Sequence, residues 1–170
     1  MHAREREFLA EPIDLEKERR MKGALVVESW MEEETLEGIE ENWGVQPGDL
    51  RSRIELLEWL LFSMKRIVAE DEELSKEGRK AHKVLFESID EVHRRVRFGC
   101  KPDILGLVAI KGVGRVRARE MSDTLGLSNP LDVCSMTERD IAKLSDLRGW
   151  SPKLVENLIV SAKKSVKRST

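Results

Sequence analysis

The sequence predicts an all-α protein made of two helical units, a bundle over residues 1–98 and a second unit over residues 99–170. Apolar residues recur at helical spacing along most of the chain, and no segment shows the alternation that is typical of a half-buried strand. Prolines and glycines stand where helices would begin and end. Charge also divides the chain. Residues 1–77 hold 11 basic and 21 acidic side chains, a net charge of −10, whereas residues 78–170 hold 19 and 11, a net charge of +8. The basic half is therefore the part expected to meet a polyanion.

Composition limits the class of protein. The longest apolar run, residues 59–62, is far shorter than the roughly 18 residues of a membrane span, so we expect no membrane helix. No secretory signal precedes the first charged residues at positions 4–6, which favours an intracellular protein. Cys100 and Cys134 are isolated in the sequence, and we expect them to be small buried residues and not a disulfide.

Three helices are expected before residue 70. The first covers residues 14–33, and Thr35 caps a short second helix that Gly44 ends. Asp49 is the expected N-cap of a third helix over residues 50–69. Apolar side chains cover more than one face of this third helix, as in a helix buried among others. Its two ends carry basic residues: Arg51, Arg53, Lys65 and Arg66.

A fourth helix is expected to begin at Ser75 and to run to Phe98, with Gly99 after its end. Its buried face would carry seven residues at helical spacing: Ala81, Val84, Leu85, Ser88, Ile89, Val92 and Val96. His82 and His93 lie 11 positions apart on this helix, too far apart to share a metal ion, so we expect neither a metal site nor a cofactor.

Short helices are expected in the second unit, because turn signals stand at residues 101–102, 129–130, 137–140 and 151–152. The first pair is typical of a helix-hairpin-helix. An apolar helix over residues 104–110 leads into Lys111, Gly112, Val113 and Gly114, and the next helix begins with Arg115, Arg117 and Arg119. The two glycines permit positive φ and a close approach, and Val113 would fill the space between the two helices.

The chemistry of this hairpin points to phosphate. The free N–H groups at the start of the second helix form an anion site, and Lys111, Arg115, Arg117 and Arg119 surround it. Such a site holds a nucleic-acid backbone without reading its bases. The alternative is a tight turn with a solvated basic face.

A weak internal repeat has a spacing of 37 residues. Six positions of the first hairpin recur as Leu144, Leu147, Gly149, Trp150, Val155 and Leu158. Ser151 stands where the second glycine would be, so the second hairpin is expected to pack better than it binds phosphate. Lys153 and the lysines near the end of the chain keep this copy basic.

Several segments together resemble the archaeal fork-repair helicases, which are superfamily-two enzymes of the superkiller-like branch and relatives of the helicase part of DNA polymerase theta. The segments are residues 24–33, 43–51, 58–60, 96–101 and 112–119, in the same order as in that family. The resemblance implies the C-terminal region of such an enzyme: a helical ratchet domain followed by a helix-hairpin-helix-like domain.

By this resemblance, residues 50–69 form the ratchet helix, and Trp59 stacks on a base of the tracking strand. Stacking on an aromatic ring tolerates any base. Arg51, Arg53 and Arg66 would contact the same strand. The family pattern has an arginine two helical turns before the tryptophan, where this chain has Ser52. The residues themselves leave a second interpretation open, in which Trp59 belongs to the core.

Three functions are compatible with these features of the sequence. The first is non-catalytic binding of single-stranded or forked DNA, as the accessory module of an ATP-dependent helicase. The second is docking of a partner such as helicase motor domains, with Trp30 or Trp43 as an anchor. The third is catalysis. It is disfavoured because the chain contains no Gly-x-x-x-x-Gly-Lys-[Ser/Thr] loop, and because residues 32–34 and 71–73 are acidic runs that point in different directions.

Overall fold

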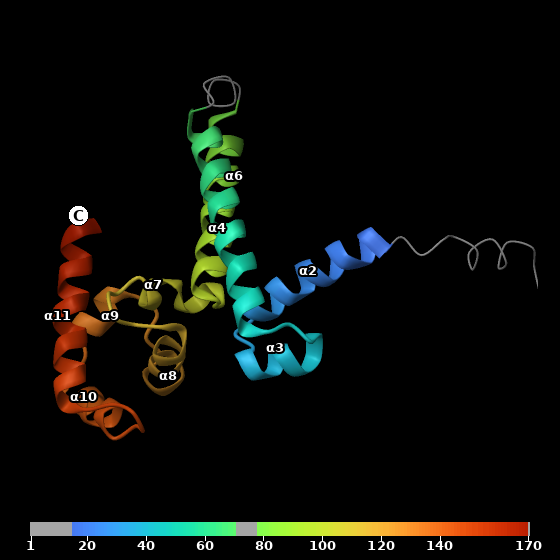
Figure 1. The fold of residues 1–170 in the computed structure, drawn as a ribbon. Helices are drawn as coiled ribbons and strands as arrows, with labels where there is room; N and C mark the ends of the chain where they lie inside the picture. Colours follow the sequence, from blue (N-terminus) through green and yellow to red (C-terminus); the bar gives the residue numbers. More distant parts are fainter. Residues whose placement is uncertain (1–14, 71–77, 170) are drawn as a thin grey trace, which may run out of the picture.

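The computed structural model describes residues 15–70 and 78–169, and every regular element in these ranges is helical, so the protein is all-α (Figure 1). The elements of the first half are α2 (Leu15–Met31), α3 (Leu36–Trp43), α4 (Pro47–Glu70) and α6 (Arg79–Phe98). Those of the second half are η1 (Pro102–Ile104), α7 (Leu105–Val108), α8 (Arg115–Leu125), α9 (Pro130–Cys134), α10 (Glu138–Ser145) and α11 (Pro152–Ser169).

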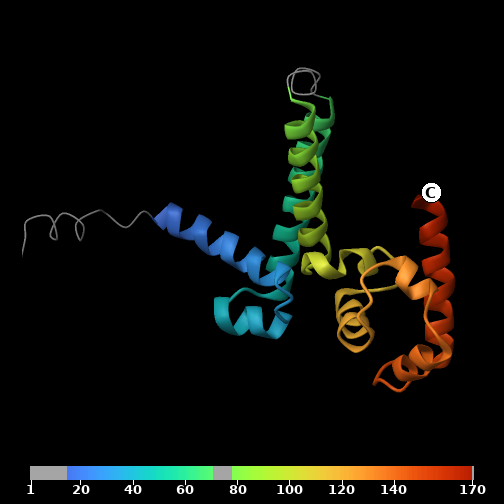
Figure 2. The ribbon, with the colours of Figure 1, turned by 180° about the vertical axis from the view of Figure 1, so that it is seen from behind.

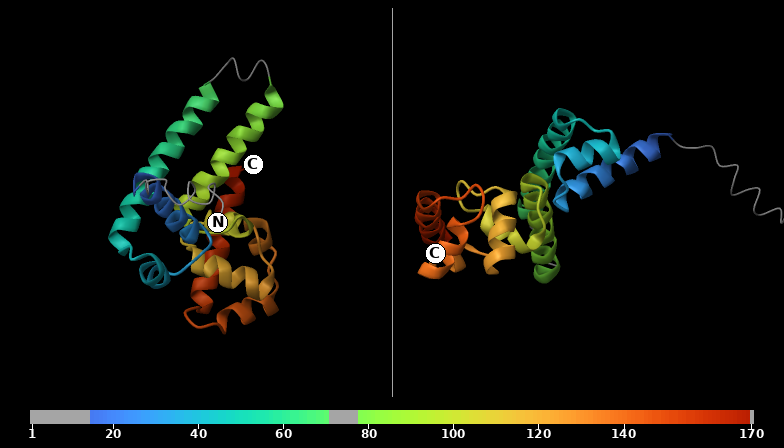
Figure 3. Two further views of the ribbon diagram at one scale, coloured as in Figure 1. Left: turned by 90° about the vertical axis from the view of Figure 1, so that its right-hand side faces the viewer. Right: turned by 90° about the horizontal axis from the view of Figure 1, so that it is seen from below.

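Helices α4 and α6 pack side by side as a long antiparallel arm (Figure 1). Helix α2 projects sideways from the base of this arm, with α3 beneath it, and the view from behind shows the same arrangement (Figure 2). Seen from below, α2 and α3 lie on one side of the arm and α8 to α11 lie on the other (Figure 3). None of the helices in the described ranges has the length and apolar character that crossing a membrane requires.

The buried side chains form two clusters. One lies at the base of the arm: Val26, Val27, Ile39, Val45, Leu50, Ile54 and Val96. The other lies within the second half, and its fully buried members include Cys100, Ile104, Leu107, Ala118, Met121, Val133, Leu144, Val155 and Ala162. Cys100 and Cys134 are both free thiols; Cys100 is buried and Cys134 is partly buried. Each half thus organises its own apolar side chains.

The expected helix ends are confirmed where local chemistry decides them. The Thr35 hydroxyl accepts a hydrogen bond from the Gly38 N–H at the start of α3. Gly44 and Gly99 end their helices in the left-handed region, with φ of 63° and 61°. The start of α4 was mispredicted, because Pro47 already begins it and Asp49 lies in its first turn. Proline is suited to this position, since its missing N–H has no partner there anyway.

The expected burial of the long helices was wrong. Within α4 only Leu50 and Ile54 are buried, and Ile67 is 69% exposed. Helix α6 begins at Arg79, and Ser75 lies outside the described residues. Of its expected inner face, five residues are exposed: Ala81, Val84, Leu85, Ser88 and Val92. The reason is geometric, because two paired helices cover only one face of each other, and no third described element covers the arm beyond its base, where α2 packs.

Candidate nucleic-acid interface

The 37-residue repeat is a repeat of backbone geometry. In the first hairpin, Ile110 N–H donates to the Leu107 carbonyl, Val113 N–H to that of Ile110, and Ala118 N–H to that of Gly114, each at 3.0 Å. In the second, the residues 37 positions later make the same three bonds at 3.2, 3.1 and 3.0 Å: Leu147 to Leu144, Trp150 to Leu147, and Val155 to Ser151. Val113 and Trp150 are both buried at the turn. The chain therefore carries two consecutive helix–turn–helix hairpins that share this backbone hydrogen bonding.

Each hairpin has one position that requires glycine, Gly112 in the first and Gly149 in the second. Gly112 and Gly149 have φ of 89° and 86°, a conformation that side chains with a Cβ seldom adopt. Gly114 was expected to share this requirement, but its φ is −92° and it is the N-cap of α8. A Cβ built at Gly114 would meet nothing within 4 Å. Ser151 takes this position in the second hairpin without strain, because its φ is not positive either.

The two hairpins differ in what caps the following helix. Helix α8 begins without a side-chain cap, and its first turn contains no acidic residue, so the N–H groups there remain available to an anion. Helix α11 begins with the Ser151 hydroxyl accepting a hydrogen bond from the Leu154 N–H at 3.3 Å. The Ser151 side chain thus satisfies one N–H group at the start of α11, whereas no side chain does so at the start of α8.

The three alternate arginines of α8 do not act together. Arg115 and Arg119 are four positions apart and share one face of the helix, whereas Arg117 lies on the opposite face. The guanidinium of Arg115 is directed at backbone carbonyls around Trp30, and that of Arg119 pairs with Glu33 and Asp103. Both groups are engaged inside the chain, so their expected part in phosphate binding has no support in these contacts.

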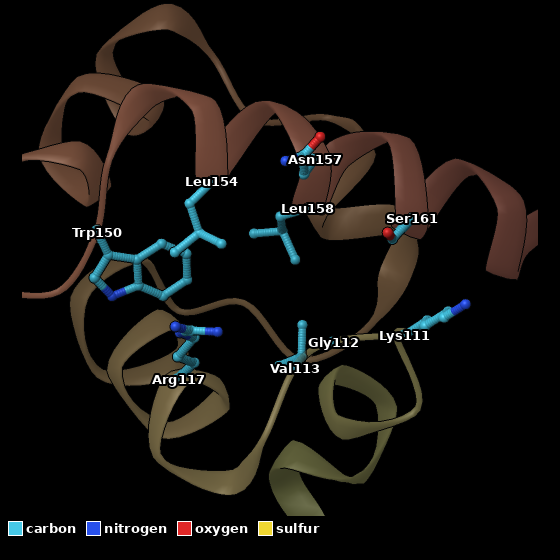
Figure 4. Close-up of a pocket in the computed structure, with 9 residues that line it drawn as sticks. All are labelled: Lys111, Gly112, Val113, Arg117, Trp150, Leu154, Asn157, Leu158 and Ser161. Atoms are coloured by element: carbon cyan, nitrogen blue, oxygen red, sulfur yellow. The ribbon is translucent and has the colours of Figure 1, made fainter.

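A cleft between the two hairpins receives Arg117. Figure 4 shows its floor and its rim, which are contributed by the first hairpin, by α8 and by α11. The floor is apolar and consists of Val113, Trp150, Leu154 and Leu158. The rim is polar and consists of Lys111, Arg117, Asn157 and Ser161. The Arg117 guanidinium lies 6.0 Å from the centre of the Trp150 ring, which orients it along the cleft.

The cations around this cleft are unpaired. Within the described ranges, no salt bridge involves Lys111, Arg117, Lys153 or Lys164. Lys153 and Lys164 are exposed and stand one turn before Asn157 and one turn after Ser161, so α11 presents all four on one face. Sequence reasoning missed Asn157 and Ser161, although their spacing from the two lysines is the signal that could have found them.

Trp59 is not part of the core. It is 62% exposed and lines a shallow hollow with Phe62 of α4 and with His93 and Arg97 of α6. Burial and the nearby Lys65 ammonium lower the pKa of His93, which favours its neutral form. Glu55 and Glu58 also line this hollow, and Arg97 forms an ion pair with Glu58 at 3.4 Å.

The other predicted residues of α4 spread around the helix. Arg66 lies two turns after Trp59 and shares its face, while Arg53 is turned away by roughly 120° at 3.6 residues per turn. Arg51 and Arg66 make only exposed ion pairs with Glu55 and Glu70 one turn away. Such pairs are weak and can be exchanged for a phosphate. Ser52 donates a hydrogen bond to the Gly48 carbonyl.

The remaining site hypotheses can also be placed. Trp30 and Trp43, the suggested partner anchors, are partly buried, and their indole N–H groups donate to the Val96 carbonyl and the Ser29 hydroxyl. They are held in the fold and do not project as anchors. The described residues contain no group of three or more histidine, cysteine or acidic side chains that could hold a metal ion.

Comparison with known proteins gives a family match and several similar relatives. The family described as "Archaeal helicase, domain 4" matches residues 2–99. The ATP-dependent DNA helicase Hel308 of Pyrobaculum calidifontis is 34% identical over 88% of this chain and 20% of its own length. Hel308 of Thermoplasma acidophilum is 31% identical over 84% of this chain and 19% of its own length. Hel308 of Pyrococcus horikoshii is 28% identical over 91% and 21%. The chain thus spans about a fifth of the length of these curated relatives.

Proposed function

The chain belongs to the family of archaeal helicase domain 4, and we propose that it binds single-stranded or forked DNA as the accessory, non-motor module of an ATP-dependent DNA helicase. The observation that carries the proposal is the cleft between the two hairpins. Lys111 and Arg117 stand there without an acidic partner among the described residues, next to the uncapped N-terminus of α8. Backbone N–H groups and cations in this arrangement bind phosphate and fix the position of a strand without selecting its sequence.

Two surfaces share the work in this proposal. The cleft, with Lys111, Gly112, Arg117 and Lys153, holds the phosphodiester backbone. Trp59 on α4 stacks on a base, with Arg66 on the same face of the helix and Arg97 across the hollow to hold the adjacent phosphates. Support for the second surface comes from exposure, because an aromatic ring that is mostly open can accept a base without any rearrangement of the fold. Arg97 would contact a phosphate by exchanging its ion pair with Glu58.

The test is salt-dependent binding to labelled single strands, duplexes and forks, followed by fluorescence anisotropy. Arg117→Gln should weaken binding to single strands about 3- to 10-fold, since one charge-assisted contact is lost. It should also reduce the slope of log affinity against log salt by about 0.7 for each phosphate contact removed. The control is Arg20→Gln on α2, an exposed arginine paired only with Glu16.

Two outcomes would contradict this role. The first is an affinity that does not depend on salt. The second is an equal loss of affinity in Arg117→Gln and Arg20→Gln, which would mean that only the net charge of the chain matters.

A second candidate function is supported by the exposed side of α4. Next to the face of Trp59, a stripe of large apolar side chains has no cover from the described residues: Leu56, Leu60, Met64 and Ile67. Exposed apolar stripes of this size mark protein contacts. The proposed partner is the motor part of a helicase, supplied as a separate chain.

A pull-down with the motor domains of a Hel308 relative separates the two functions. Leu60→Asp should abolish capture of the motor domains and leave the affinity for single strands unchanged. Trp59→Ala should do the reverse. If Leu60→Asp and the unmodified chain capture the motor domains equally well, this stripe is not the docking surface.

A further inference from the structure

The two helical halves meet at a polar network that neither half contains by itself. It joins Arg115 and Arg119 of α8 to the turn between α2 and α3, residues 30–34. Most of the exposed ion pairs of this chain link residues one turn apart on a single helix. This network instead links residues 81 to 86 positions apart in the sequence.

Arg115 is half-buried against the first half of the chain. Its guanidinium lies 3.9 Å from the centre of the Trp30 ring. One terminal nitrogen donates to the carbonyls of Trp30 and Gly99 at 3.2 and 3.1 Å, and the other donates to that of Glu34 at 2.9 Å. The carbonyls of Trp30 and Glu34 flank the end of α2. Arg115 therefore supplies a donor to the Glu34 carbonyl and a second donor to the Trp30 carbonyl, which also accepts the Glu33 N–H at 3.2 Å.

Arg119 makes the complementary ionic contact. It donates to both carboxylate oxygens of Glu33 at 2.7 Å and to both oxygens of Asp103 at 2.7 and 2.9 Å. Glu33 also accepts the backbone N–H of Lys101 at 2.9 Å. Its side chain is only 15% exposed, so the pair is partly shielded from solvent. Two-pronged pairing of this kind fixes geometry as well as adding energy.

Glu33 lies just after the end of α2 in a left-handed turn. Among the described residues it is the one non-glycine residue with a positive φ, 71°. Its N–H donates to the Trp30 carbonyl at 3.2 Å and the Glu34 N–H donates to the Ser29 carbonyl at 3.0 Å, the pattern of a helix that ends in a left-handed residue. The side chain of Glu33 is then fixed by Arg119 and by the Lys101 N–H.

We propose that Arg115 and Arg119 are positioning residues, which lock α8 onto the α2–α3 turn so that the cleft and the Trp59 face of α4 stand at a fixed separation. Arg117, on the opposite face of the same helix, is left to contact the phosphate. One short run of sequence thereby serves both tasks, with alternate arginines facing in opposite directions. The contribution of this lock to strand binding rests on the function proposed above. The attachment of α8 to the α2–α3 turn does not depend on that function.

The lock is tested directly by the distance between the two halves in solution. Nitroxide labels at Lys80→Cys on α6 and Lys163→Cys on α11, in a Cys134→Ala background, report this distance by electron–electron double resonance. Cys100 is buried, and burial raises the pKa of its thiol to about 11, so it resists labelling. The unmodified network should give one narrow distance distribution.

Arg119→Gln and Glu33→Gln should each broaden this distribution, and the double variant should broaden it no further. Arg117→Gln is the matched control, because it removes the same group from the other face of α8, and it should leave the distribution narrow. Circular dichroism identifies variants that keep their helices; should Arg119→Gln unfold, Glu33→Gln and Asp103→Asn give the same test. Distributions as narrow as that of the unmodified chain in the folded variants would overturn the proposal.

Strand binding supplies the second readout, with oligo(dT) of about 6 nucleotides, enough for the cleft, and of about 30, enough to reach α4 as well. Glu33→Gln and Arg119→Gln should both weaken binding of the longer strand about 3- to 10-fold and leave the shorter one unchanged. A phosphate-binding Arg119 would give a different pattern, because Glu33→Gln removes a negative charge and would strengthen binding of both strands. If neither strand binds the unmodified chain, the proposed function fails, and the distance measurement still decides the lock.

Discussion

Replacing Gly99 by alanine should destabilise the protein far more than the same replacement at Gly126. Both glycines end a helix with nearly equal φ, 61° and 68°. Both donate their N–H to the carbonyl four positions earlier at 2.8 Å. They differ in their surroundings, because a Cβ at Gly99 would lie 2.2, 2.4 and 2.7 Å from atoms of the Trp30 ring, whereas at Gly126 it would meet nothing within 4 Å.

The magnitude follows from this difference. At either site the left-handed conformation costs alanine about 1–2 kcal/mol. At Gly99 the Trp30 ring must also move by more than an ångström to restore an ordinary carbon contact of about 3.5 Å. Overpacking of this kind adds about 1–3 kcal/mol, and losing the 2.8 Å hydrogen bond from the indole N–H to the Val96 carbonyl adds about 1 kcal/mol. We expect a loss of about 3–6 kcal/mol for Gly99→Ala and about 1–2 kcal/mol for Gly126→Ala.

Urea unfolding followed by circular dichroism measures both losses. A double-mutant cycle with Trp30→Ala isolates the clash, since the cost of Gly99→Ala should fall to that of Gly126→Ala once the ring is absent. If Gly99→Ala costs no more than Gly126→Ala in the otherwise unchanged chain, Trp30 does not pack against the end of α6 as described. The contact of the Arg115 guanidinium with the Trp30 ring would then be wrong as well.

Three further outcomes are expected. Burial raises the pKa of Glu33, but its hydrogen bonds from Arg119 and from Lys101 N–H outweigh this, and hydrogen bonding to Arg119 lowers that of Asp103. Both carboxyls have folded pKa values below their unfolded ones, so unfolding takes up protons. The stability that they contribute should be complete at neutral pH and lost below about pH 4.5. In Glu33→Gln, the urea midpoint should depend less on pH over this acid range. Trp59→Ala should change the unfolding free energy by less than about 1 kcal/mol, since its ring is largely exposed, yet lower single-strand affinity by about 1–3 kcal/mol in anisotropy titrations. Cys100 should react with iodoacetamide at least about 100-fold more slowly in the native chain than in urea, as measured by mass spectrometry.

What the sequence could predict was local. Thr35, Gly44 and Gly99 cap their helices as expected, because capping depends on a few neighbouring residues. The hairpin and its copy 37 positions later were also predictable, since each turn needs one glycine and a fixed set of apolar positions around it. Gly114 was misjudged because the letters Gly-x-Gly do not reveal which of the two glycines has the positive φ.

The role of the α8 arginines could be recognised only from the folded structure. Periodicity alone separates Arg117 from Arg115 and Arg119, so the sequence contained the division between the two faces. It did not contain which face meets phosphate, because Glu33 lies 86 positions from Arg119 and only the packing of α8 on the α2–α3 turn brings them together. A cluster of positive residues in the sequence is therefore not a cluster of available charges. Arg115 is engaged by backbone carbonyls, and Arg119 is neutralised by Glu33 of the first half and Asp103 of the second.

The error over α4 has a different cause and leads back to function. Its apolar residues cover most of the circumference, a pattern that indicates burial on several sides. The structure supplies cover on one side only, from α6 and the base of the arm, and leaves Trp59, Phe62 and Ile67 exposed. The pattern and the fold are compatible if the missing cover is a ligand. Trp59 then suits a base because its ring is open and Arg97 lines the same hollow, whereas the stripe through Leu60 and Ile67 suits a protein because its side chains are apolar. The two proposals for this helix consequently concern different faces, and a variant on one face can be judged without disturbing the other.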